Sequence, residues 1–576
     1  QIVALTTAQV SKMTTDQLAV LETQDLAVFT SGQIQALSGE QIESLSIEQI
    51  VGMQRGQFSS MTTDQLAALK TDQIEAIETF DIGGFSTTQI DSLSTEQISA
   101  FKTGQIASLS QLQLAALNEE QIQTLSSSQL KAIEVRDMPA LTTLQAVSLL
   151  PEQLSVFTTD QIAALNNASL ASLRTDQVVA LTTAQVGALR QRQMAALTTD
   201  QVAALETKQI VAIPTQNMVA MTAAQVAAMT SEQLNKLSSS QLQAIETRDI
   251  AAMRTEQITN LDTAHIVALS TQQVVALRID EIAALQTSQI EKMETEDLAA
   301  LTSGQLRTLN SDQLLALTTL QVPSLRTAQL ITLKTDQINV LSSTQLNVMG
   351  SAQINNLTTE QVAALTTDQV STLKTDHITA LNTTVLGALT TEQVAALTTT
   401  QLIKLSTANV AALSTAQVAA LTTEQVAHMT SGQIRALENA DLQAMSTDQL
   451  VALTTDQIDK LTTAQLNALT SDQIPALSTT QIGKLSTTQL ANLTTTHLQE
   501  LESAQIAALS SDQLVALVST QYAALLAAQV QAISTTNIAA LESGDVAGFT
   551  STQVAALLTD QVKALTTEQV SVLTTA

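Results

Sequence analysis

The octad QVAALTTD, at residues 361–368, decides the fold of this chain. It repeats in phase from Gln1 to Ala576 without an inserted or deleted residue, so the 576 residues divide into 72 octads. Counted from the glutamine, position 1 is Gln in 56 octads, position 2 is always apolar and position 5 is always a large apolar residue. Position 4 is usually Ala, positions 6 and 7 are usually Thr or Ser, and position 8 is often Asp or Glu. A short, unbroken period predicts stacked units in a solenoid.

Each octad contains a signal for a helix start. Residues 6–9, Thr-Thr-Ala-Gln, have the form of a capping box, in which the Thr side chain accepts from the backbone three residues on and the Gln bonds back. The apolar residues that follow, such as Val10 and Met13, are spaced i and i+3 and lie on one face of a single turn. We therefore expect an all-α fold of 72 short helices of about six residues, each with a bend at positions 5 and 6.

Two other secondary structures fit the octad less well. In one long helix an eight-residue period overshoots two turns, so the apolar stripe would wind around the rod, and a coiled coil requires seven or eleven residues. A β-solenoid requires alternation and Gly-rich turns, whereas Ala, Leu and Gln favour helix. Pro139, Pro323 and Pro475 stand at position 3, where a regular α-helix resists proline, so we expect one turn that is partly 3₁₀.

The unbroken phase predicts one continuous solenoid over residues 1–576, with a core of positions 2 and 5 and the Ala at position 4. The chain starts and stops on octad boundaries, and polar end caps are not evident. We therefore expect it to be a segment of a longer protein. The pattern leaves the number of octads per coil and the handedness open.

The amino-acid composition limits the binding partners that we expect for this chain. The formal charge of −29 is spread thinly, with 13% charged residues, and such an acidic surface disfavours nucleic acid and anionic membranes. No run of 18 apolar residues occurs, so we expect no membrane insertion by this segment. Cysteine is absent, which excludes disulfides and thiol chemistry.

A second pattern couples two positions. Position 1 is Asp in seven octads, and in all seven the residue three before it, at position 6, is Glu. Glu occupies position 6 in only two other octads, so the two positions covary. The favoured interpretation is a rearranged helix cap with direct contact between the two residues. The alternative is a Ca²⁺ site completed by neighbouring coils, with the candidate ligands Glu22, Asp25, Glu78, Asp81, Glu134 and Asp137.

The spacing of these aspartates has two explanations. Asp25, Asp81 and Asp137 follow one another at intervals of seven octads, and Asp249 lies two such steps further on. Seven octads are either an older duplication unit or the step that returns to one face of the superhelix. We favour duplication, because the series fails after Asp249.

No octad has the residues of a catalytic or cofactor site. His265, His377 and His497 replace the position-1 Gln and are interpreted as substitutes for its cap bond, and His428 is isolated. The Thr and Ser residues include no Ser–His–Asp set that differs from the repeat, and no Gly-rich phosphate loop occurs. We expect no enzyme activity. Stacked Thr-Thr pairs would form a hydroxyl array, and an array that binds ice, minerals or glycans is the alternative to simple capping.

Two families contain similar segments. Residues 173–181 resemble the first helix of transcription-activator-like effector repeats, but the 34-residue period and the base-reading loop of that family are missing. All 72 octads more closely resemble the Leu-Thr-Thr-x-Gln-Val/Ile-x-Ala tracts of giant bacterial exoproteins described as adhesin-like or haem-utilisation-like. This resemblance implies an extracellular or cell-surface location and the role of a stalk, and it implies no active-site residue.

The expected function is structural. We expect a stalk, spacer or filament of a bacterial surface protein, with self-association into fibres or sheets. The first alternative is an adhesin-like binding scaffold, in which one solenoid face engages a protein or glycan. The second is a disordered Thr-rich tract, which the intact apolar positions disfavour.

Overall fold

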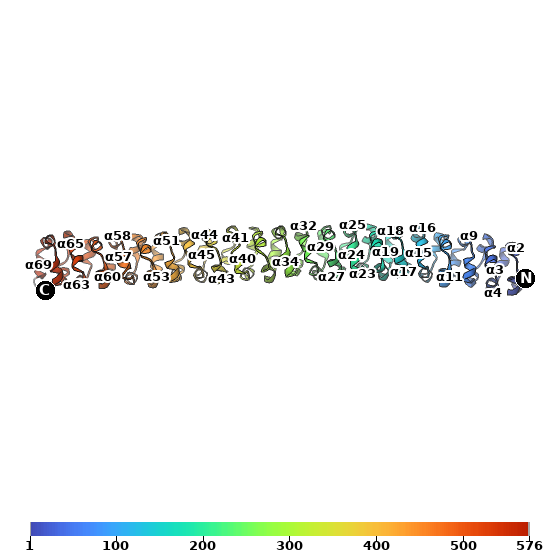
Figure 1. Ribbon diagram of the computed structural model, residues 1–576, viewed down its shortest axis with the longest axis horizontal. Helices are drawn as coiled ribbons and strands as arrows, with labels where there is room; N and C mark the ends of the chain where they lie inside the picture. Colours follow the sequence, from blue (N-terminus) through green and yellow to red (C-terminus); the bar gives the residue numbers. More distant parts are fainter. Residues whose placement is uncertain (1, 574–576) are drawn as a thin grey trace. The chain divides into compact units, whose positions relative to one another are not determined.

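The computed structural model describes residues 2–573, and its chain forms two compact units, Gln1–Met293 and Glu294–Ala576. Each unit is a succession of single helical turns joined by two-residue extended links (Figure 1). The described residues contain no strand. The prediction of an all-α solenoid of short helices is confirmed.

The helices start and end where the octad dictates. Every α-helix except α57 (Gln473–Ala476) begins at position 7, and the helices contain four to seven residues. Consecutive helices of the first unit include α4 (Ser31–Gln35), α5 (Gly39–Glu43), α6 (Ile47–Gly52), α7 (Arg55–Ser60), α8 (Thr63–Ala67), α9 (Thr71–Ala76), α10 (Thr79–Ile82) and α11 (Thr87–Ser92). Those of the second include α49 (Thr407–Ala411), α50 (Thr415–Ala419), α51 (Thr423–His428), α52 (Ser431–Ala436), α53 (Asn439–Ala444), α54 (Thr447–Val451), α55 (Thr455–Lys460) and α56 (Thr463–Leu466).

The predicted capping box starts these helices. In α8, the Gln65 N–H donates to Thr62 Oγ1 at 3.3 Å, and the Thr62 N–H donates to Gln65 Oε1 at 2.9 Å. Thr62 has extended backbone angles, and most helices stop at position 3 or 4, as α11 does before the extended Leu93. No residue in the described range has a positive φ, so the bend needs no glycine.

Proline at position 3 tightens the turn at two of the three expected places, whereas Pro475 lies in the α-helix α57. Met138–Ala140 (η2) and Val322–Ser324 (η3) are 3₁₀ turns centred on Pro139 and Pro323. In other octads the N–H at position 3 can donate to the carbonyl four residues earlier, as Ser11 does to Thr7 at 2.9 Å. Proline has no N–H, so the turn closes instead through the Ala140 N–H and the Asp137 carbonyl at 2.9 Å.

Three octad positions are buried. Leu66 and Leu69, at positions 2 and 5 of one octad, are buried, which confirms both as core. Gln65, at position 1, is also buried, which the sequence did not predict. The expectation that the Ala at position 4 belongs to the core is wrong for most octads, because residues such as Ala68 are half-buried. The third buried position of the octad is therefore position 1 and not position 4.

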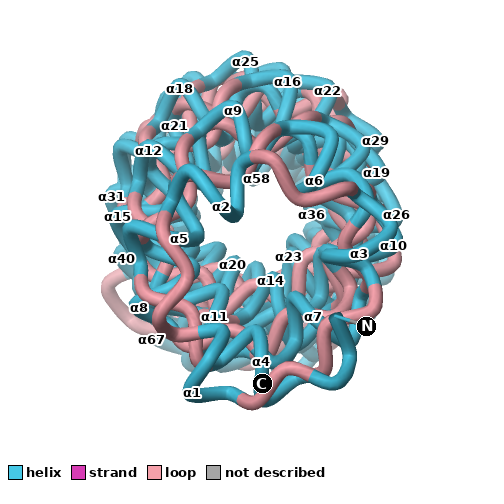
Figure 2. The backbone as a smooth tube through the Cα atoms, turned by 90° about the vertical axis from the view of Figure 1, so that its right-hand side faces the viewer, coloured by secondary structure: helices cyan, strands magenta, loops and turns pink. Residues whose placement is uncertain are grey.

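Contacts run between successive coils within each unit. Helix α8 packs against α5 and α11, three helices before and after it, and α53 packs against α50 and α56 in the same way. Viewed along the first unit, the successive helices α5, α6 and α7 lie on different sides of the axis, whereas α5, α8 and α11 lie on the same side (Figure 2). Each coil therefore takes between three and four octads, and the hydrogen bonds described next fix the number.

Candidate functional site

A buried glutamine joins each coil to the one before it. Gln65 Nε2 donates to the carbonyls of Leu37 and Ile34, both at 2.7 Å, which lie 28 and 31 residues earlier at positions 5 and 2. Its Oε1 accepts from the Thr62 N–H. We call this set of bonds the glutamine bridge. Both N–H groups and the oxygen of the amide are used, so the polar side chain can be buried without an unpaired group.

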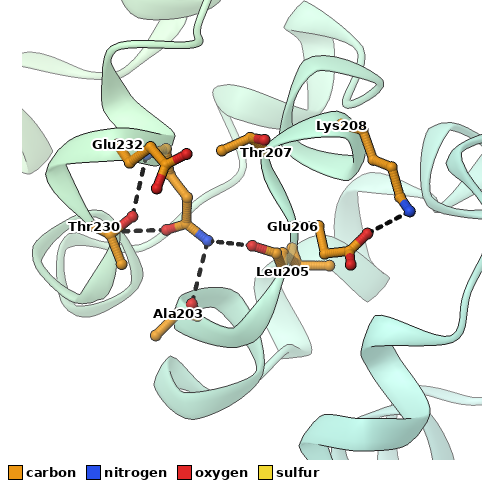
Figure 3. Close-up of a pocket in the computed structure, with 8 residues that line it drawn as sticks. Ala203, Leu205, Glu206, Thr207, Lys208, Thr230 and Glu232 are labelled. Atoms are coloured by element: carbon orange, nitrogen blue, oxygen red, sulfur yellow. Dashed lines mark hydrogen bonds and ion pairs between the residues drawn. The ribbon is translucent and has the colours of Figure 1, made fainter.

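The same bridge recurs in both units. Around Gln233, the Thr230 N–H donates to Oε1 at 2.8 Å, and Nε2 donates to the carbonyls of Leu205 and Ala203 at 2.6 and 3.3 Å (Figure 3). In the second unit, Gln457 Nε2 donates to the Met429 carbonyl at 2.6 Å. The link of 28 residues is 3.5 octads, and the bonds between coils span 25 to 31 residues, so each coil takes about 3.5 octads.

Asparagine and serine at position 1 keep the bond to the position-5 carbonyl 28 residues earlier. Asn409 and Asn537 reach it with Nδ2, at 2.8 Å from Leu381 O and 2.9 Å from Leu509 O. Ser169 is too short for a bridge, but its Oγ donates to Leu141 O at 2.6 Å. Asn166 Nδ2 adds a second bond to the same carbonyl at 2.9 Å. The bond to this carbonyl is thus retained while the side chain that makes it varies.

A glutamate at position 1 is matched by an arginine. Glu281 Oε2 accepts from the Arg278 N–H at 2.6 Å, as a bridging glutamine would, but a carboxylate has no donor for the preceding coil. The Arg278 guanidinium supplies it: Nη1 donates to Met253 O and lies 3.0 Å from both that carbonyl oxygen and Glu281 Oε1. Burial raises the pKa of Glu281. The Arg–Glu pair therefore replaces one glutamine.

An asparagine at position 3 can replace the part of the bridge in which the glutamine oxygen accepts the N–H of the helix cap. Asn467 Oδ1 accepts from the Thr494 N–H at 3.1 Å, and its Nδ2 donates to Asn492 O at 2.7 Å. Thr494 caps the helix whose position-1 residue is His497, which does not accept that N–H. The chain has five Asn residues at position 3, and four lie 30 residues before the only His or Val residues at position 1. The pairs are Asn235 with His265, Asn347 with His377, Asn355 with Val385 and Asn467 with His497.

The histidines therefore act differently from the prediction. We expected the imidazoles to replace the cap bond of glutamine, but Nε2 of His265, His377 and His497 instead bonds the carbonyl 28 residues earlier, at 2.9–3.0 Å. His265 Nδ1 also bonds the Asp262 carboxylate at 2.6 Å. His428 is exposed at position 4 and bonds only within its own turn. The asparagine series above is what the sequence interpretation missed, and its 30-residue spacing was visible in the sequence.

We expect the hydrogen bond between His377 and the Met349 carbonyl of the preceding coil to weaken in acid. Burial lowers the pKa of His377, and Lys374 lowers it further, so the folded imidazole binds protons less readily than the unfolded one. The free energy of unfolding should then fall as the pH drops below the ordinary histidine value of 6.5. Hydrogen exchange in α45 (Thr375–Ala380) of the native chain and His377→Gln should diverge below that pH. A constant ratio of exchange rates would refute this, and exposed His428→Gln is the control.

The Glu–Asp candidates are brought together only in part. Glu78 and Glu134 are exposed, whereas Asp81 and Asp137 are buried. Arg136 lies between one pair, with Nη2 2.8 Å from Glu134 Oε2 and Nε 3.5 Å from Asp137 Oδ2. For Glu22 with Asp25, no side-chain cap bond forms. Within residues 2–573, no three His, Asp or Glu side chains gather closely enough to hold a metal ion.

The seven-octad spacing of these aspartates now has a geometric meaning. Two links of 28 residues equal seven octads, so Asp81 and Asp137 are two coils apart within the first unit. The interpretation that seven octads return to one face of the superhelix, which we placed second, agrees with this geometry. Duplication of a seven-octad unit remains compatible with it, because such a unit preserves the register.

The remaining cavities have simple linings. An enclosed apolar cavity of about 20 Å³ lies among position-2 and position-5 side chains of residues 354–389, beside Val385. Shallow surface grooves lie between coils, such as the one lined by Glu206, Lys208 and Thr230. The longest helix in the described range has seven residues, and none could traverse a bilayer.

Comparisons with known proteins find one family. A family model described as the ALTTAQ repeat matches residues 18–55, 74–111, 159–279, 290–327, 345–519 and 538–575. A search of curated proteins finds no match. Among solved structures, "Structure of APUM23-GGAGUUGACGG" aligns at 12% identity over 86% of this chain and 92% of that chain, with a TM-score of 0.13. "Structure of APUM23-GGAAUUGACGG" aligns at 12% identity over 87% and 92%, with a TM-score of 0.12. These scores are too low to support a conclusion about fold or function.

Proposed function

Because the chain belongs to the ALTTAQ repeat family, we propose that it is a structural stalk or spacer whose reach is set by the number of octads. The observation that supports this function is the constancy of the bridge. The link of 28 residues joins Gln33 to Leu5 near the start of the first unit, and it joins Gln569 to Leu541 near the end of the second. Each added octad brings the same bonds and the same two core residues, so length grows without a new kind of contact.

The bridge also suits a load-bearing role. The amide bonds of Gln65 and Gln457 join backbone groups of adjacent coils and are shielded from water, where hydrogen bonds are stronger. Pulling two coils apart would expose these donors and carbonyls together with the core residues of positions 2 and 5. A stalk built in this way resists extension at each coil rather than at one specialised point.

The location and the partners are part of the same proposal. Like the exoprotein tracts that it resembles, the chain would be the repeat region of a bacterial surface protein of the adhesin-like type, located outside the cell. Its acidic exposed positions, such as Asp64 and Asp448, would keep neighbouring stalks apart, and association into fibres or sheets would require their screening. Nucleic acid is not an expected partner, and catalysis is not an expected activity.

Small-angle X-ray scattering on chains of different length tests this function. Deleting residues 361–416 removes seven octads, or two of the links between coils, and leaves every remaining octad in phase. We expect the cross-section to stay constant while the maximum dimension falls by roughly 20 Å, the spacing of about two packed helix layers. A control deletion of residues 361–413 breaks the phase and should disrupt the fold.

Two results would count against a spacer. A flexible-chain profile with no defined cross-section would contradict a solenoid stalk. Tight binding of a glycan or protein by the full chain, lost on removal of one particular group of octads, would favour the binding scaffold, because a spacer depends on the number of octads and not on their identity.

A further inference from the structure

Apart from Val385, which has no polar group, aspartate is the position-1 residue that cannot complete the bridge when ionised. Glutamine and asparagine supply N–H donors to the position-5 carbonyl of the preceding coil, histidine and Ser169 supply their own donors, and Glu281 has Arg278. An ionised aspartate has only acceptors. Asp441 uses Oδ2 to accept from the Glu438 N–H at 3.0 Å, so its other oxygen is left for the preceding coil.

Asparagine shows where that second oxygen lies. Asn409 has the same shape as an aspartate and occupies the same octad position, and its Nδ2 lies 2.8 Å from Leu381 O. Asn537 Nδ2 lies 2.9 Å from Leu509 O. An aspartate whose side chain takes the same direction as Asn409 would bring a carboxyl oxygen to hydrogen-bond distance of that carbonyl oxygen. Two oxygens can lie so close favourably only when a proton or a cation lies between them.

The aspartates are buried deeply enough for this to matter. Asp249 and Asp441 are each 2% exposed, and Asp249 Oδ2 has no hydrogen-bond partner. In the register that joins Asn409 to Leu381, the position-5 carbonyls that they face belong to Met221 and Leu413. A charged oxygen buried against a carbonyl dipole is strongly unfavourable, whereas a neutral carboxylic acid would satisfy both groups.

We propose that Asp249 and Asp441 are proton-binding sites, in which each carboxylate takes up one proton from solvent and donates the resulting O–H to the position-5 carbonyl of the preceding coil. The bridge then closes in acid and opens in base. Asp441 best represents the set. The two helices packed against its own helix α53, α50 and α56, carry no charged residue, so Glu438 is the charged group that faces it.

This proposal explains the covariation with glutamate. Burial raises the pKa of these aspartates, and the carboxylate three residues earlier acts in the same direction, whereas Arg248 lowers the pKa of Asp249 and Arg55 lowers that of Asp81. The pairs are Asp81 with Glu78, Asp249 with Glu246, Asp441 with Glu438 and Asp545 with Glu542. The Glu side chain makes no cap bond in any of them. Its role is thus to favour the neutral form of its partner, which neither a rearranged cap nor a duplication requires.

A proton fits these sites better than a metal cation. Beside Asp249, the Arg248 guanidinium already lies 3.4 Å from Oδ1 and 2.9 Å from Glu246 Oε2. At Asp81 the charged neighbours are Glu78 and Arg55.

The sign of the pH dependence follows. Because the pKa of Asp441 is raised on folding, the folded chain binds more protons there than the unfolded chain. Its contribution to stability is therefore complete below the ordinary value of 3.8 and is lost as the pH rises through the folded pKa. This is opposite to the pH dependence of His377.

The experiment compares hydrogen exchange in α53 and α50 of the full chain with that of Asp441→Asn, which carries a permanent N–H donor of the same shape. At about pH 8 we expect several-fold slower exchange in the variant, and the difference between the two chains should be smaller at about pH 5. Asp448→Asn, at the exposed position 8 of the same octad and in α54, is the matched control and should show no such difference. Glu438→Gln should shift the onset of the effect to lower pH.

Two outcomes would overturn the proposal. One is a ratio of exchange rates between Asp441→Asn and the native chain that is the same at both pH values. The other is slower exchange of the native chain at about pH 8 on adding Ca²⁺ or K⁺, with no such response in Asp441→Asn, since a cation rather than a proton would then complete the bridge.

Discussion

Gln65→Glu should lower the free energy of local unfolding around α8 by about 3 kcal/mol, because it removes both donors from a buried bridge and adds a charge. The carboxylate can still accept from the Thr62 N–H, so the helix cap survives. The carbonyls of Ile34 and Leu37 lose their partner and face an oxygen instead. Hydrogen exchange of α8 and α5 under native conditions measures this local free energy, which a global unfolding curve of a long repeat chain does not isolate.

The chain itself contains the change that should restore the bridge. Residues 62–65 read Thr-Thr-Asp-Gln, and residues 278–281 read Arg-Ile-Asp-Glu. In the latter, Arg278 Nη1 donates to the carbonyl 25 residues earlier, and the guanidinium is held by Asp280 at 3.1 Å. Adding Thr62→Arg to Gln65→Glu should recreate this pair and recover most of the lost protection from exchange.

The matched control is Gln272→Glu. Gln272 is exposed at position 8, where acidic residues are common in this chain, so the same chemical change should cost little there. The bridge would not hold the coils together if Gln65→Glu cost no more than Gln272→Glu. If adding Thr62→Arg gave no recovery, a donor to the carbonyl of the preceding coil would not be what completes the bridge.

The local half of the structure could be predicted from one octad. Thr62 and Gln65 are three residues apart, so the capping box follows from their identities, and Leu66 and Leu69 follow from the i, i+3 spacing. The core assignment was wrong at position 4 because the third buried residue of the octad is the glutamine at position 1. A glutamine that pairs all its polar groups can be buried. The partners that pair the amide nitrogen lie in another coil, which one octad does not reveal.

The register between coils was hidden by the regularity of the chain. When all octads are alike, a bond from position 1 to position 5 of an earlier octad fits any number of intervening octads equally well, and the consensus does not distinguish them. Only the octads that break the consensus carry this information. The four Asn residues at position 3 that precede a His or Val at one common spacing identify the register of the bridge once that spacing is noticed.

Asn467→Ala should destabilise the coil around α60 (Thr495–Glu500) by about 1–2 kcal/mol, since it removes two hydrogen bonds at the edge of the bridge. The Thr494 N–H loses its acceptor because His497 offers none, and Asn492 O loses the Nδ2 donor. Hydrogen exchange of α60 measures the change. Asn339→Ala is the control, because the octad in the corresponding register after Asn339 has Gln369, whose Oε1 already accepts the cap N–H of Thr366.

A double-mutant cycle separates replacement of the glutamine from a merely additive contact. In a His497→Gln background, the new Oε1 should accept the Thr494 N–H, and Nε2 should reach the carbonyls of Leu469 and Leu466, at positions 5 and 2 of the preceding coil. Asn467→Ala should then cost only the bond to Asn492, about half its cost in the native chain. Equal costs in the two backgrounds would mean that the asparagine and the position-1 residue act independently, and their covariation along the chain would have no structural cause in the bridge.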